Sequence, residues 1–142
     1  MENSSSLSIL TIKVLKFMGE CGARYPLDNF ENIYMYVYRM LQDNRVVEIG
    51  KNGTTEGYLF YSLCHDINSY YKKKTWRYVP QVTNGTTLYV EKLVCKKWTK
   101  ELRRKFEEII TTMYPQIEGA IWHRYGLKMD RKVIYRRNLC MK

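Results

Sequence analysis

Residues 86–98 read Thr-Thr-Leu-Tyr-Val-Glu-Lys-Leu-Val-Cys-Lys-Lys-Trp. A run of β-branched, aromatic and alternating residues is typical of a strand on a half-buried sheet. From Thr99 the apolar period changes to that of a helix, for which Thr99 can act as the N-cap and Pro115 as the stop. We therefore predict a strand over 87–97 that passes directly into a helix over 99–113.

The predicted helix has one apolar and one charged face. Its apolar residues are Leu102, Phe106, Ile109, Ile110 and Met113, and its charged residues include Lys100, Arg103, Arg104, Glu107 and Glu108. We expect the helix to pack on a central mixed sheet through Leu102, Phe106, Ile109 and Met113.

Two lysines, Lys96 and Lys97, lie where the strand passes into the helix. Unpaired backbone N–H groups and the positive end of the helix dipole favour an anion at a helix N-terminus. The junction is therefore a candidate site for a phosphate or a carboxylate. The alternative is that the lysines only keep a solvated surface soluble.

The length of 142 residues predicts one domain over 1–142 with a single core that folds without covalent cross-links. No apolar run is long enough to span a bilayer, and the N-terminus lacks the features of a secretory signal, so we expect a cytoplasmic protein. Four scattered cysteines with no C-x-x-C pair, and only two histidines, indicate neither a metal site nor a disulfide framework.

The net charge of +10 is unevenly distributed along the chain. Residues 1–71 carry 6 basic and 8 acidic side chains, whereas residues 72–142 carry 18 basic and 6 acidic ones. This asymmetry suggests that the C-terminal half meets an anion, which could be nucleic acid, an anionic cofactor or an acidic partner.

The first half of the chain predicts two helices and a hairpin. Apolar residues recur at helical spacing over 4–18 and again over 28–42. Two β-rich runs over 45–63 flank a turn that contains Asn52-Gly53, which predicts a hairpin. Gly57 interrupts the second strand and suggests either a bulge or a close approach to the backbone.

Residues 64–85 mix aromatic and basic side chains and are interpreted as an exposed loop, with a single-stranded nucleic-acid platform as the alternative. Beyond the helix, residues 116–125 are predicted to form a strand, 126–130 a turn and 131–137 a last strand. Two helices, a hairpin, a strand, a helix and two closing strands define an α+β fold.

This order resembles the fold of the GNAT N-acetyltransferases over residues 28–137. Val-Val-Glu-Ile at 46–49, Asn52-Gly53 and Glu-Gly-Tyr-Leu at 56–59 look like the family's second and third strands, and Thr-Leu-Tyr-Val-Glu-Lys-Leu-Val at 87–94 looks like its fourth. Trp122-His123-Arg124 is similar to a motif of compact phage members and of toxin-activating lysine acyltransferases.

The resemblance implies an acyltransferase that uses acetyl-CoA or another acyl thioester, without a metal, to modify an amine or a protein acceptor. It implies a general base at Glu91 and an acid at Tyr125 or Tyr135. The family's pyrophosphate loop is Gln/Arg-x-x-Gly-x-Gly/Ala, whereas residues 95–101 contain no glycine, so lysines would have to replace close backbone approach by charge. The donor-binding residues would be Val94, Lys96, Lys97, Trp98, Thr99 and Lys100.

Three functions remain open at this point. The first is the acyltransferase, or an inactive relative of one. The second is a nucleic-acid-binding protein that uses Lys72, Lys73, Lys74, Arg77, Arg103, Arg104, Arg131, Arg136 and Arg137. The third is a protein–protein adaptor without enzymatic activity.

Overall fold

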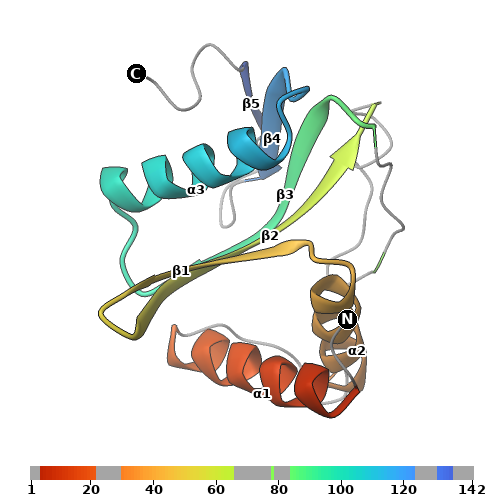
Figure 1. Cartoon of the computed structure of the whole chain (residues 1–142), viewed down its shortest axis with the longest axis vertical. Coiled ribbons are helices and arrows are strands. Elements are labelled where there is room, and N and C mark those ends of the chain that lie inside the picture. Colours follow the sequence, from red (N-terminus) through yellow and green to blue (C-terminus); the bar gives the residue numbers. More distant parts are fainter. Residues whose placement is uncertain (1–3, 22–29, 66–77, 79–83, 124–130, 136–142) are drawn as a thin grey trace.

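The computed structural model describes residues 4–21, 30–65, 78, 84–123 and 131–135. These residues form three helices and five strands (Figure 1). In chain order the elements are α1 (Ser4–Glu20), α2 (Phe30–Gln42), β1 (Val46–Lys51), β2 (Thr54–Cys64), β3 (Thr87–Cys95), α3 (Lys100–Met113), β4 (Gly119–His123) and β5 (Arg131–Tyr135). Each lies within about three residues of its predicted boundaries.

The five strands form one sheet in the order β1-β2-β3-β4-β5. The pairs β1–β2, β2–β3 and β4–β5 are antiparallel, whereas β3 and β4 are parallel. Parallel neighbours need a crossover connection, and here α3 provides it. The prediction of an α+β fold with a mixed, mostly antiparallel sheet is confirmed.

The helices cover both faces of the sheet, with α3 on one face and α1 and α2 on the other (Figure 1). This arrangement follows from the side chains of β2, where alternate residues point to opposite faces and all residues from Gly57 to Cys64 are buried. Tyr61 and Leu63 belong to the core beneath α3. Tyr58 and Phe60 belong to the core beneath α1 and α2.

The packing of α3 differs from the prediction at one end of the helix. Leu102, Phe106 and Ile110 are buried, as the apolar face requires. Met113, which we expected to pack on the sheet, is 46% exposed because it is the last helical residue, one turn beyond the final buried position. The prediction for Met113 is therefore wrong.

The predicted hairpin is confirmed, and its turn has the expected backbone. Asn52 and Gly53 have φ angles of 53° and 78°, as the two-residue turns that match the twist of paired strands require. Both features suggested for Gly57 occur. The pairing of β1 with β2 slips next to it, and a Cβ at Gly57 would lie 3.0 Å from the Val94 carbonyl oxygen.

Substitution of Phe106 tests whether α3 is fixed to the sheet as described. Phe106 is 4% exposed, so Phe106→Ala should lower the free energy of unfolding by about 3–5 kcal/mol. Urea denaturation measures this change. The matched control is Met113→Ala on the same helix, which should change the free energy by less than about 0.5 kcal/mol. Equal effects of the two substitutions would contradict the placement of α3.

Candidate functional site: the β3–α3 junction and the bulge in β3

The junction between β3 and α3 is capped as the sequence predicts. Lys96, Lys97 and Trp98 connect the strand to Thr99, whose side chain accepts a hydrogen bond of 3.1 Å from the backbone N–H of Leu102. Thr99 therefore satisfies one of the backbone N–H groups of the first turn of α3. The positive end of the helix dipole lies next to the connection formed by residues 96–98.

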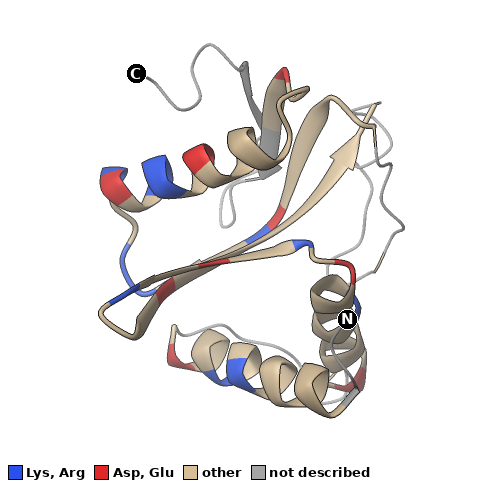
Figure 2. Cartoon of the chain, viewed as in Figure 1, with Lys and Arg blue, Asp and Glu red and all other residues tan. Residues whose placement is uncertain are grey.

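Most of the predicted donor-binding residues are exposed at this junction. Lys97 and Lys100 are exposed, and Trp98 is 50% exposed although it is large and apolar. In Figure 2 part of the connection between β3 and α3 is blue, the colour of Lys and Arg residues. The result is an accessible cationic and aromatic surface at the start of a helix.

Two of the predicted donor-binding residues have contacts on the opposite face of the sheet. Lys96 forms an ion pair with Glu20 at the end of α1, with 3.5 Å between Nζ and Oε1, and its Nζ lies 5.6 Å from the centre of the Phe17 ring. Val94 packs against the core beneath α1 and α2. An anion at the junction would therefore meet Lys97 and Lys100 directly and compete with Glu20 for Lys96.

The strand that leads to this junction pairs with its parallel neighbour over a short stretch. Among the described residues, 87–89 of β3 pair with β4, in the register Thr87 to Gly119 through Tyr89 to Ile121. Residues 90–95 pair with β2 on one side, and within the described ranges no strand pairs with their other side. A strand edge of this kind offers backbone donors and acceptors to an extended ligand.

Residue Glu91 lies in a β-bulge of the same strand. In the pairing of β2 with β3, Phe60 is opposite Lys92 and Tyr61 is opposite Val90, so Glu91 is an extra residue on β3. Partners across an antiparallel pair point to the same face, which places Lys92 on the face of Phe60, beneath α2. The carboxylate of Glu91 reaches Tyr36 of α2, so both charged side chains lie on this face.

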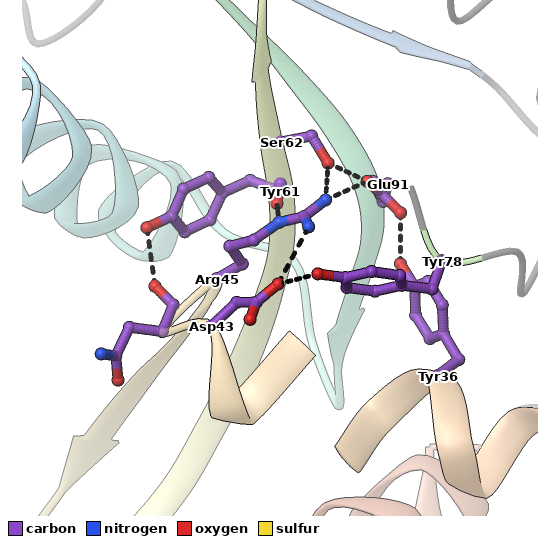
Figure 3. Close-up of polar contacts among 8 residues, drawn as sticks. Tyr36, Asp43, Arg45, Tyr61, Ser62, Tyr78 and Glu91 are labelled. Carbon is purple, nitrogen blue, oxygen red and sulfur yellow. Dashed lines mark hydrogen bonds and ion pairs between the residues drawn. The ribbon is translucent and has the colours of Figure 1, made fainter. Parts of the chain in front are cut away.

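The Glu91 carboxylate accepts three hydrogen bonds in the interior (Figure 3). Tyr36 donates its hydroxyl to Oε1 at 2.5 Å. The hydroxyl of Ser62 and Nη2 of Arg45 both donate to Oε2, the latter at 3.1 Å. The side chains of Arg45 and Glu91 are 0% and 2% exposed, so they form a buried ion pair.

The Arg45 guanidinium is itself held from several directions. Its Nε donates to the carbonyl oxygen of Tyr61 at 3.2 Å, its Nη1 lies 3.4 Å from Asp43 Oδ2, and its Nη2 donates to Ser62. The ring of Tyr78 covers the guanidinium at 5.3 Å, and the Tyr78 hydroxyl donates to Asp43 (Figure 3). That hydrogen bond, together with burial, raises the pKa of Tyr78.

The hydrogen bonds to its carboxylate give Glu91 a structural role, in addition to the general-base role that the resemblance implies. A base must reach the proton that it removes, and the Glu91 oxygens are occupied by Tyr36, Ser62 and Arg45. The base role of Glu91 stays a prediction. From the sequence we proposed no functional role for Arg45, Ser62 or Tyr36.

Lys92 differs from the other lysines of the described ranges by its environment. Burial lowers its pKa to about 8, an effect that the neighbouring charge of Glu91 partly opposes. At the end of the strand, burial raises the pKa of the Cys95 thiol, which therefore stays protonated near neutral pH.

The other predicted site residues are not brought together by the described part of the chain. Tyr125, Lys72, Lys73, Lys74, Arg77, Arg136 and Arg137 lie outside the described residues, and Tyr135 and Arg131 are placed only as the two ends of β5. On α3, Arg103 forms an ion pair of 2.7 Å with Glu107, and the helix carries both basic and acidic residues (Figure 2). Arg104 is exposed on the same helix.

No protein-family model, no curated protein and no solved structure matches the chain. The resemblance to the GNAT fold therefore stays a prediction. None of the helices in the described ranges is long and apolar enough to cross a bilayer. Among the same residues, no group of three His, Cys, Asp or Glu side chains could hold a metal ion.

The contribution of the buried ion pair to the free energy of unfolding can be separated from the contribution of each of its two charges. Arg45→Met leaves a buried carboxylate without its cation and should lower the free energy of unfolding by about 3–5 kcal/mol. The double substitution Arg45→Met/Glu91→Leu removes both charges and should be more stable than Arg45→Met alone. Urea denaturation of both variants measures these changes.

The control is Arg104→Met, which removes an exposed charge and should have an effect below about 0.5 kcal/mol. A double variant that is less stable than Arg45→Met would contradict the description of the two charges as a compensating pair.

Proposed function

We propose that this protein binds a CoA-type acyl donor at the β3–α3 junction and transfers its acyl group to an amine. The observation that supports the proposal is that a strand edge and a helix N-terminus follow each other directly. Within the described part of the chain, residues 90–95 of β3 have no strand partner on one side, and this edge leads directly to the capped, cationic N-terminus of α3.

The two parts of this site match the two parts of such a donor. A chain with amide groups can hydrogen-bond along a strand edge as an added strand would. Its pyrophosphate would then meet the backbone N–H groups and the dipole of the first turn of α3. The donor is thus recognised through its shape and its phosphate charge, without a glycine-rich loop.

Positive charge at the junction would replace the close backbone approach to a phosphate that a glycine-rich loop allows. Lys97 and Lys100 are exposed beside the helix N-terminus, and Lys96 is held by Glu20 in a half-exposed ion pair. Such exposed pairs contribute only about 0–1 kcal/mol, so an incoming phosphate can displace Glu20 at little cost. The exposed Trp98 ring offers a flat surface next to the same charges.

Charge reversal at the junction tests this proposal. Lys96→Glu/Lys97→Glu should abolish binding of coenzyme A, because it replaces attraction of the pyrophosphate by repulsion. The fold should stay intact, since negative charge near a helix N-terminus is favourable and the exposed Lys96–Glu20 pair that the change removes contributes only about 0–1 kcal/mol. Isothermal titration calorimetry with coenzyme A measures the affinity of the parent and of the variant.

The matched control is Arg103→Glu/Arg104→Glu, which changes the net charge equally on the first turns of the same helix. This control should reduce the affinity by less than about tenfold, as expected for a screened long-range field. Unchanged affinity in the junction variant, an equal loss in both variants, or no affinity in the parent protein would each refute the proposed donor site.

A further inference from the structure

The tetrapeptide Asn-Gly-Thr-Thr occurs twice in this chain, at residues 52–55 and 84–87. An asparagine followed by glycine is chemically labile, because the backbone nitrogen of a residue without a side chain can approach the asparagine amide closely. The two copies have the same local sequence, so a difference in their reactivity must come from the fold. The structure places them in different environments.

The first copy forms the tip of the β1–β2 hairpin (Figure 1). Asn52 and Gly53 are both exposed, and within the described part of the chain a Cβ added at Gly53 would have no heavy atom within 4 Å apart from its chain neighbours. No hydrogen bond or ion pair among these residues holds the Asn52 side chain. The register slip beside Ile49 separates the tip from the rest of the hairpin, so the tip can open locally with little free energy.

The second copy is held from several sides. Oδ1 of Asn84 lies 3.0 Å from Nε2 of His65, in a hydrogen bond. Gly85 is buried, and a Cβ there would lie 2.6 Å from the backbone nitrogen of Cys64. The carbonyl oxygen of Gly85 accepts a hydrogen bond of 3.4 Å from Nε2 of Gln116. The amide of Asn84 and the backbone of Gly85 therefore cannot rotate toward each other without breaking these contacts.

We propose that Asn52 is a site of spontaneous deamidation and that the fold protects Asn84. In this reaction the backbone nitrogen of Gly53 loses its proton and attacks Cγ of Asn52, and the new C–N bond closes a cyclic imide. The bond between Cγ and the side-chain nitrogen breaks, and the nitrogen leaves as ammonia with the electron pair and a proton. Water then adds to either carbonyl carbon of the imide and opens the ring to aspartate or isoaspartate. The net change is the uptake of water and the loss of ammonia.

The reaction changes the hairpin in two ways. Both products carry a carboxylate in place of a neutral amide, which adds a negative charge beside Lys51. Aspartate before glycine is still compatible with a two-residue turn, whereas isoaspartate lengthens the backbone within the turn by a carbon atom. We therefore expect isoaspartate to weaken the pairing of Lys51 with Thr54 at the tip.

Incubation of the folded protein at mildly alkaline pH, followed by peptide mass spectrometry, tests the proposal. Asn52 should deamidate at least about tenfold faster than Asn84, because the two sites differ in the free energy of local opening. In denaturing urea the two rates should agree within about twofold, since the unfolded chain offers the same tetrapeptide twice. Equal rates in the folded protein, a faster reaction at Asn84, or a preference that persists in urea would overturn the proposal.

Two matched variants identify the site in the intact protein. Deamidation adds a negative charge, so ion-exchange chromatography of the parent should show an acidic species that accumulates with time. Asn84→Asp should gain a further acidic species at the rate of the parent. Asn52→Asp already carries the charge of the product and should lose this fast conversion. A fast conversion that survives in Asn52→Asp would assign the reaction to another residue and contradict the proposal.

Discussion

The buried ion pair between Arg45 and Glu91 is the interaction on which the rest of the structure depends. It connects the turn after α2 with the third strand of the sheet, and through Tyr36 and Ser62 it also holds α2 and β2. Burying two charges costs several kcal/mol, and mutual attraction offsets this cost only where further hydrogen bonds satisfy the remaining donors and acceptors. The additional bonds from Tyr36, Ser62, Asp43 and the Tyr61 carbonyl meet that condition.

The same interaction lies at the irregular part of β3. Glu91 contacts Arg45 and Tyr36 at the bulge, and the bulge moves the following residue, Lys92, to the same face of the sheet. Beyond the bulge the strand continues to the capped start of α3, and within the described residues it has no strand partner on its β4 side there. The bulge thus determines the face on which Lys92 lies, next to the strand edge at which we place the donor.

The sequence predicted the features that depend on neighbours along the chain. The Asn52-Gly53 turn, the Thr99 cap and the apolar face of α3 are local patterns, and the structure contains all three. The sequence alone could not predict the Arg45–Glu91 ion pair. Its two residues lie 46 positions apart, and their contact depends on the register of the sheet. Arg45 follows a helix in a polar turn and has no local feature that would indicate burial. Met113 has the correct helical angle for burial, but the extent of the sheet beneath it is a tertiary property.

The junction between β3 and α3 is the place at which we propose that the donor binds. The most direct test is a titration of isotopically labelled protein with coenzyme A, followed through its backbone amide resonances. We predict that the largest shifts occur at the amides of residues 97–101 and continue along residues 90–95. Absence of shifts at residues 97–101, or shifts confined to other parts of the chain, would contradict donor binding at this junction.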